Sequence, residues 1–339
     1  MLSDGELRAR MQGATAISDE VINHIYKKRW LQIWVPQSYG GLGCDFKTGI
    51  TYLYEWAKID GSLGWMLTLC SGANYFARNM LPETAKRLFA KEYTCFGGSG
   101  MVGGTADEQE DGSYLLQGVW HYATGAPYLS HFTLNARLLK QGKPRLDAEG
   151  NPCIRSFIVE QSKVTIIPNW KSMGMKATGT FSFEVNQVTV PADYHFVYDT
   201  FYTADVVTKI PFRTFADLTL LVNYLGMAYH YMEEAQTVLP AKVLASDQSE
   251  INTAFETVLD YASQIEIALA NNAAVALEIQ EEIHTFGTQV VAQLIEQVIR
   301  VHVQLGIKGT QVDQPIHQVF ADFFTATQHA NFRSDLTVF

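Results

Sequence analysis

Residues 95–105 form a glycine-rich segment that reads CFGGSGMVGGT and contains the pattern GxGxxG from Gly98 to Gly103. A dinucleotide-binding fold requires a helix to begin inside such glycines, so that its N-terminus faces the pyrophosphate. Here a polar turn follows at residues 106–112, and residues 114–120 read as a strand. No β–α–β unit can be built from this order. We therefore expect a loop between two strands, either flexible or lying with its backbone close to a flat ligand.

Strand patterns extend around this segment, over residues 93–200. Residues 181–185 alternate strictly between apolar and polar side chains, as a half-buried strand does. Residues 131–138, 154–159 and 164–167 are further strand candidates, and Asp111-Gly112 separates two short runs in the manner of a hairpin. Short strands with frequent turns predict a small barrel or sandwich.

Helical patterns flank the strands on both sides. Ile50, Leu53, Tyr54 and Ala57 repeat at helical spacing, and Gly61 is expected to end that helix. From about residue 214 the spacing predicts three or four long helices, with breaks near residues 240–247, 286–287 and 306–313. The fold class is therefore α+β. We predict an N-terminal helical domain over residues 1–92, a β-barrel domain over 93–200 and a C-terminal helical bundle over 201–339.

Composition excludes several classes of protein. The 339 residues include 25 Lys and Arg against 35 Asp and Glu, a net charge of −10, which argues against binding to nucleic acid or to an anionic membrane. No apolar run approaches the ~20 residues of a membrane-spanning helix, and the first residues do not resemble a signal peptide. The four cysteines lie far apart in the sequence, which is typical of reduced thiols in a cytoplasmic protein. No metal site is expected.

Five motifs occur in a recognisable order along the chain. They are VPQSYGGLG (35–43), DGSLGW (60–65), the glycine-rich segment 95–105, GVWHYATG (118–125) and WKSMGMK (170–176). Together they resemble the acyl-CoA dehydrogenase superfamily of flavoproteins, with features of its flavin-dependent hydroxylase branch. The resemblance implies a helical N-terminal domain, a small β-barrel and a C-terminal four-helix bundle. It also implies a homo-oligomer, a dimer or a tetramer. Charge-poor helices in the C-terminal part are consistent with that, and equally with the inner face of a single bundle.

The resemblance also implies a flavin cofactor, FAD or FMN, and residues that would hold it. A flat isoalloxazine ring needs a slot between a sheet and helices, with hydrogen-bonding groups along its edge. Ser99 and Thr124 are the candidates for the ring edge, although both residues would also serve to cap turns. Trp120 and Tyr122 would flank the ring or, alternatively, fill the barrel core. A further pair, Gly104 and Thr105, would approach a phosphate.

The late part of the chain departs from the family pattern. An acyl-CoA dehydrogenase needs a carboxylate to remove a proton next to the thioester, and no Glu stands at the usual late position. In a minority branch the base lies on the first bundle helix, where Asp217 would serve, unless it is a helix N-terminal charge. The hydroxylase branch ends with two arginines, an aspartate and a Gln-His pair.

Here Asp322 and Gln328-His329 match that ending, whereas Gln318 and Ala321 replace the arginines. The resemblance places His329 beside the flavin where oxygen reacts; the alternative is a histidine on a helix surface. Losing the arginines implies that a flavin pyrophosphate or an acyl-CoA tail would be held differently.

Three functions follow. The first is a flavin-dependent oxidoreductase of the monooxygenase kind, which takes reduced flavin from a separate reductase and uses oxygen on an apolar or aromatic small molecule. The second is an acyl-CoA dehydrogenase with a relocated base. The third is a catalytically degenerate member that serves as a flavin-binding or assembly subunit.

Overall fold

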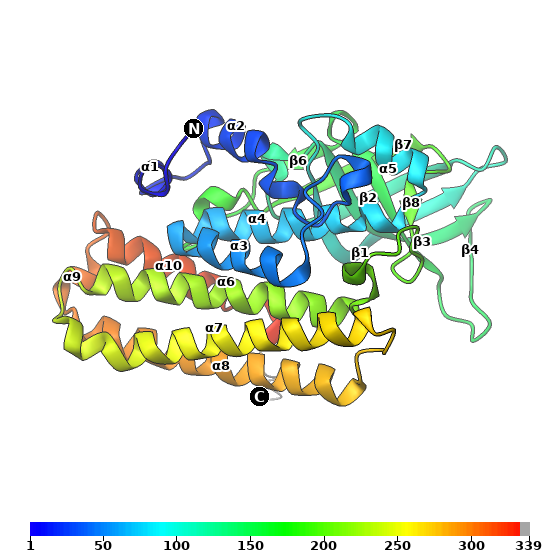
Figure 1. Ribbon diagram of the computed structural model, residues 1–339. Helices are drawn as coiled ribbons and strands as arrows, with labels where there is room; N and C mark the ends of the chain where they lie inside the picture. Colours follow the sequence, from blue (N-terminus) through cyan, green and yellow to red (C-terminus); the bar gives the residue numbers. More distant parts are fainter. Residues whose placement is uncertain (333–339) are drawn as a thin grey trace.

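The computed structural model describes residues 1–332 and places one β-sheet beside layers of helices (Figure 1). The N-terminal helices are α1 (Asp4–Met11), α2 (Asp19–Lys28), α3 (Phe46–Ile59), α4 (Gly61–Asn74) and α5 (Pro82–Phe89). The C-terminal helices are α6 (Phe212–Ala235), α7 (Ala241–Ala270), α8 (Leu277–Gln304), α9 (Ile307–Thr310) and α10 (Pro315–Ala326). The α+β class is confirmed, while the domain boundaries near residues 92 and 200 stay predictions.

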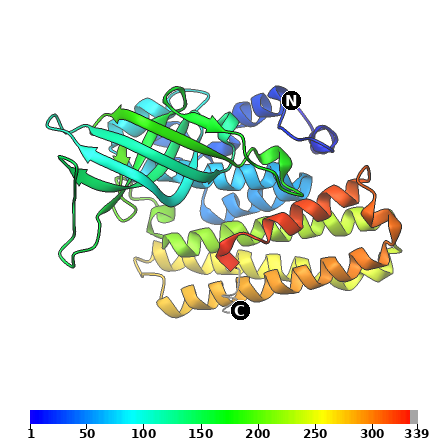
Figure 2. The same cartoon turned by 180° about the vertical axis from the view of Figure 1, so that it is seen from behind.

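The sheet lies in the middle of the chain and is open (Figure 2). Its strands are β1 (Phe96–Glu108), β2 (Tyr114–Ala123), β3 (His131–Lys140), β4 (Lys143–Pro144), β5 (Ile154–Glu160), β6 (Thr165–Ile167), β7 (Phe181–Val190) and β8 (His195–Phe196). Their order is β6-β7-β2-β1-β3-β5-β8, with β4 beside β3, and β1 pairs with β3 in parallel. The edge strands β6 and β8, three and two residues long, do not pair with each other over the described residues. A closed barrel is therefore not confirmed.

The glycine-rich segment is mostly strand β1 and not a loop, contrary to our expectation. Its glycines permit close packing instead of flexibility. A Cβ atom at Gly98 would lie 1.8 Å from the carbonyl oxygen of Thr133 on β3, so only glycine fits there. The pairing of β1 with β3 shifts its register between Ser99 and Val102, which marks a β-bulge in the middle of the segment.

The C-terminal helices α6, α7 and α8 run side by side, and the two views agree (Figures 1 and 2). Helix α6 lies at the centre, because it packs against α7, α8 and α10 and also against α3 and α4 of the N-terminal part. Its contact with α3 is more extensive than any of its contacts with the C-terminal helices. A separate four-helix bundle is therefore not confirmed. Over residues 1–332, no helix combines the length and the apolar character that crossing a membrane requires.

Two glycines that were expected to end or interrupt helices have other roles, although the expected break between α3 and α4 is present. Helix α8 continues through Gly287. A Cβ atom there would lie 2.4 Å from the ring of Phe332, so the absence of a side chain at Gly287 makes room for that ring. Gly61 begins α4 instead of ending α3, because the Asp60 carboxylate caps α4 by accepting the Leu63 N–H at 2.9 Å.

Asp60 also belongs to a buried pair of carboxylates that joins distant parts of the chain. Gln318 of α10 donates its side-chain N–H to Asp60 Oδ2 at 3.2 Å, and Asp322 accepts the backbone N–H of Met175 from the loop before β7. Burial, and then repulsion by Asp322, raise the pKa of Asp60 to about 8. Burial raises the pKa of Asp322 to about 6. Gln318 stands where the resemblance has an arginine, so at this position the pair meets a neutral amide instead of a guanidinium.

Replacing Asp60 with asparagine should therefore make stability less dependent on pH. Both pKa values lie above those of an unfolded chain, near 4. Between about pH 4 and 8 the folded protein thus holds more protons than the unfolded one, and its stability falls as pH rises. Asparagine keeps the helix cap without the charge. The free energy of unfolding of Asp60→Asn should therefore exceed that of the parent by on the order of 1–3 kcal/mol at pH 8, and by little near pH 4.5.

Urea unfolding at the two pH values measures this difference. Asp45→Asn is the matched control, because exposed Asp45 caps α3 through the Thr48 N–H at 2.7 Å. If stability falls with pH equally in the parent and in Asp60→Asn, the proposed effect of the Asp60 charge is wrong.

Candidate active site

A cavity of about 230 Å³ opens between the sheet and the helices α4 and α6. Strands β1, β2 and β3 form one wall, and α4 and α6 form the other. The sheet wall comprises Gly97, Gly98, Ser99, Gly100, Tyr122, Thr124, Thr133, Leu134 and Asn135. The helical wall comprises Thr68, Leu69, Gly72, Ala73, Phe212, Phe215, Ala216, Thr219 and Leu220, and Phe76, Phe196 and Tyr198 close one end. A slot between a sheet and helices is what the resemblance implies for a flavin ring.

The β-bulge in β1 shapes the sheet wall. Ser99 accepts the Met101 N–H at 3.3 Å, and its own hydroxyl proton has no acceptor among the described residues. A Cβ atom at Gly100 would meet no atom within 4 Å, so the backbone borders open space here. The bulge thus presents an unused O–H donor and bare backbone toward the cavity.

A second bulge separates Trp120 from Tyr122, which simple alternation would place on the same face of β2. The pairing of β2 with β7 shifts its register between Trp120 and Ala123, and Tyr122 has a φ of 64°. Such a φ is strained for a bulky residue and is typical of functional positions. Tyr122 is consequently 66% exposed and lines the cavity, whereas Trp120 is 0% exposed. The strain at Tyr122 is what turns its ring toward the cavity.

Trp120 is a core residue, so its predicted place at a flavin ring is corrected. Its indole N–H donates to the carbonyl oxygen of Asn135 at 2.9 Å, and its ring stacks on Phe183 with 5.5 Å between centroids. Of the two alternatives, the geometry supports the core reading.

Gly104 and Thr105 do not reach the cavity either. Gly104 pairs with Gly118 of β2, and a Cβ atom at Gly104 would lie 2.8 Å from the Trp120 ring and 2.2 Å from the Gln117 carbonyl oxygen. Thr105 pairs with Gln117 in the same ladder. The later glycines of the segment therefore make room for the buried indole, and nothing in the geometry brings these two residues to a phosphate.

Thr124 lines the cavity at the end of a chain of hydroxyls. Thr178 donates its hydroxyl to the Met175 carbonyl at 2.8 Å, Thr180 lies 2.7 Å from Thr178, and Thr124 lies 3.1 Å from Thr180. Because the Thr178 proton is committed, Thr180 donates to Thr178 and Thr124 donates to Thr180. Thr124 therefore presents only acceptor lone pairs to the cavity.

Asp217 faces away from the cavity, which corrects its predicted place as a base. Ala216, Thr219 and Leu220 lie on the cavity side of α6, and the next residue after Ala216 is rotated about 100° around the helix. Asp217 is buried against α8, where His284 Nδ1 lies 3.1 Å from one carboxylate oxygen. Asn331 donates to the other oxygen at 2.8 Å.

His329 lies after α10 and also does not line the cavity. Its ring meets Trp65 of α4 edge to face, with 5.5 Å between centroids, and its Nδ1 accepts the Asn331 N–H at 3.3 Å. Partial burial lowers the pKa of His329. The two predicted catalytic residues are thus joined through Asn331, behind the helical wall.

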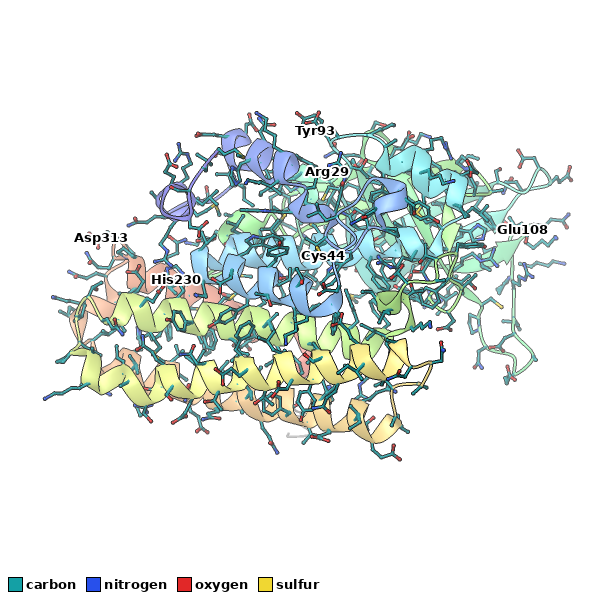
Figure 3. The ribbon with its side chains drawn as sticks, viewed as in Figure 1. Arg29, Cys44, Tyr93, Glu108, His230 and Asp313 are labelled. Carbon is teal, nitrogen blue, oxygen red and sulfur yellow. The ribbon has the colours of Figure 1, made fainter. Side chains whose placement is uncertain are left out.

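Ionisable side chains are scarce at the cavity itself. Over the described part of the chain, no carboxylate, imidazole or cationic side chain lines it, and Tyr122 and Tyr198 are its only phenols. Glu108 and Asp313, for example, lie toward opposite ends of the molecule (Figure 3). Sequence reasoning missed the helical wall altogether, because Gly72 and Thr219 belong to no motif.

Several known proteins are similar to this chain in sequence. No family model matches the chain. The oxygenase subunit HsaA, a flavin-dependent monooxygenase of Mycobacterium tuberculosis H37Rv, is 22% identical over 355 residues, covering 96% of this chain and 88% of that protein. The indole-3-acetate monooxygenase of Acinetobacter baumannii is 23% identical (73% and 62% covered). A dibenzothiophene monooxygenase of Rhodococcus erythropolis is 26% identical (75% and 64% covered).

Solved structures agree on the fold. The crystal structure of the Mycobacterium tuberculosis HsaA monooxygenase superposes with a TM-score of 0.86 at 21% identity, covering 97% of this chain and 91% of that one. XiaF from Streptomyces, solved with FADH2 and glycerol, gives a TM-score of 0.82 at 19% identity, covering 97% and 89%. The chain therefore shares the fold of these solved structures, which is consistent with the acyl-CoA dehydrogenase-like fold that its motifs resemble.

Proposed function

We propose that this protein is the oxygenase component of a flavin-dependent monooxygenase that acts on an apolar aromatic small molecule. The observation that carries the proposal is the cavity between the bulged sheet and α4 and α6, whose described lining contains no carboxylate or imidazole. Such a cavity supplies shape and hydrogen bonds but no acid or base, so the reactive group must come from a cofactor. The similarity to HsaA over 96% of the chain supports the same conclusion.

The lining residues fit a flavin. Gly72 on α4 and Gly100 on β1 both leave open space, as a flat ring requires. Ser99 supplies a hydroxyl donor for an acceptor atom of the ring, and Thr124 supplies an acceptor for an N–H, which reduced flavin carries at more of its ring nitrogens than oxidised flavin does. Reduced flavin would supply two electrons to oxygen, so that one oxygen atom enters the substrate and the other leaves as water. The protein's part is to hold both molecules and to exclude bulk water.

The dehydrogenase alternative has less support. Removal of a proton beside a thioester needs a carboxylate within hydrogen-bonding reach of the substrate. Asp217, the candidate, is held by His284 and Asn331 on the other side of α6. The degenerate-subunit alternative would be supported only by an absence of turnover.

The partners that we propose follow from the same reading. A separate reductase would supply the reduced flavin, since the HsaA relative is described as an oxygenase subunit. A homo-oligomer, dimer or tetramer, is supported by an exposed apolar stripe at the end of α8, where Ile299 and Val303 are 43% and 76% exposed. We propose the cytoplasm as its location on the sequence alone.

Anaerobic titration with reduced FMN and FAD tests the proposed function. We expect saturable binding of at least one reduced flavin, followed by oxygen-dependent turnover of a neutral aromatic compound. Separately, the oxidised flavin complex should keep its visible absorption when acyl-CoA thioesters are added without oxygen. Bleaching by a thioester would favour the dehydrogenase, and failure to bind any flavin in either redox state would contradict both readings.

A further inference from the structure

Two threonines of the helical wall have their hydroxyl protons committed to the backbone. Thr68 donates to the Gly64 carbonyl oxygen at 2.8 Å, one turn earlier on α4. Thr219 donates to the Phe215 carbonyl oxygen at 2.8 Å and lies 3.2 Å from that of Ala216 on α6. A hydroxyl has one proton and two lone pairs. Both oxygens therefore offer lone pairs, and no proton, to whatever occupies the cavity.

Asn223 holds the first of these hydroxyls in place. It lies one turn beyond Thr219 on α6, is 0% exposed, and donates its side-chain N–H to Thr68 Oγ1 at 2.9 Å. This bond occupies one lone pair of Thr68 and fixes its orientation from behind the wall. Turning the Thr68 proton toward a ligand would therefore disrupt two hydrogen bonds at once.

The surroundings of the two threonines are apolar and aromatic. Phe76, Phe196 and Phe212 pack together at one end of the cavity, with ring centroids 4.8 Å apart for Phe76 and Phe196 and 5.4 Å for Phe76 and Phe212. No cationic side chain of the described residues lines the cavity, so a substrate carboxylate would have no counter-charge here. Burying an unpaired charge is costly, which excludes anionic substrates.

We propose that Thr68 and Thr219 are specificity-determining acceptors that select a neutral aromatic substrate bearing an O–H or N–H group. This inference rests on the proposed function and narrows its substrate class. It separates this chain from two of its relatives: indole-3-acetate carries a carboxylate, and dibenzothiophene carries no hydrogen-bond donor. A bare aromatic thioether would leave both acceptors unpaired in the cavity.

Calorimetric titration of the flavin-loaded protein with indole and with benzothiophene tests this inference, because the two compounds differ mainly in N–H against sulfur. We expect indole to bind roughly five-fold more tightly or better, the effect of one neutral hydrogen bond. Thr219→Val should reduce that preference by weakening indole alone, because only Thr68 then remains as an acceptor, and Thr219→Ser should keep the parent's preference. Thr253→Val is the matched control, because exposed Thr253 makes the same bond to a carbonyl one turn earlier on α7.

Equal affinity for both compounds, or a Thr219→Val variant that weakens both equally, would overturn the inference while leaving the proposed function intact. Flavin binding is measured first, so that its failure is recognised as failure of the proposed function. In that case the titrations with indole and benzothiophene are made on the flavin-free protein. Tighter binding of indole would support the two acceptors, and equal affinity for both compounds would contradict them.

Discussion

Replacing Gly72 with leucine is expected to abolish binding of flavin and substrate while leaving the protein folded. Gly72 lies on the cavity side of α4, and a Cβ atom built on it would meet no atom within 4 Å. The four carbons of leucine would therefore extend into a cavity of only about 230 Å³ without a clash that destabilises the fold. Leucine also favours a helix over glycine by about 1 kcal/mol. We expect flavin affinity to fall by on the order of 100-fold or more, about 3 kcal/mol.

Quenching of flavin fluorescence measures the affinity, and thermal unfolding monitors the fold. Gly5→Leu is the matched control, since Gly5 is an exposed residue of helix α1 and also has open space around its Cβ position. We expect Gly5→Leu to bind flavin as the parent does. A folded Gly72→Leu variant with unchanged affinity would place the flavin elsewhere and would contradict the proposed site.

Features of the sheet wall that depend on short segments could be predicted from the sequence. Ser99, Tyr122 and Thr124 all line the cavity, and each belongs to one of the quoted motifs. A motif fixes the order of residues along one strand, and the two neighbouring strands β1 and β2 then bring their motifs together. The α+β order followed from periodicity for the same reason, since helical and strand repeats are local properties.

Features that depend on packing between distant segments could not be predicted. Trp120 and Tyr122 are two residues apart, and only the bulge opposite β7 sends one into the core and the other to the cavity. Asp217 has the chemistry of a base, but the docking of α8 and Asn331 turns it away. A signal for Trp120 did exist: Gly103, Gly104 and Gly118 leave a gap across two strands, which a large ring must fill.

Replacing Trp120 with alanine should destabilise the protein by about 3–5 kcal/mol, the usual cost of emptying a large aromatic site in a core. The ring is 0% exposed and stacks on Phe183. Glycines enclose it, and glycines have no side-chain atoms that could move in to fill the gap. The change also leaves the Asn135 carbonyl oxygen without its indole donor in a buried place. Urea unfolding of the flavin-free protein measures this loss.

Tyr122→Ala is the control that separates the two aromatic residues of β2. Its side chain is 66% exposed, so we expect a change in stability within about 0.5 kcal/mol but weaker flavin binding, because the ring borders the cavity. Trp120→Phe should recover part of the stability lost in Trp120→Ala and bind flavin as the parent does. If Trp120→Phe instead kept the parent's stability and lost flavin affinity, the indole would act at the cofactor and its assignment to the core would be wrong. The contrast follows from a single bulge, since without the register shift between Trp120 and Ala123 both rings would lie on one face of the strand.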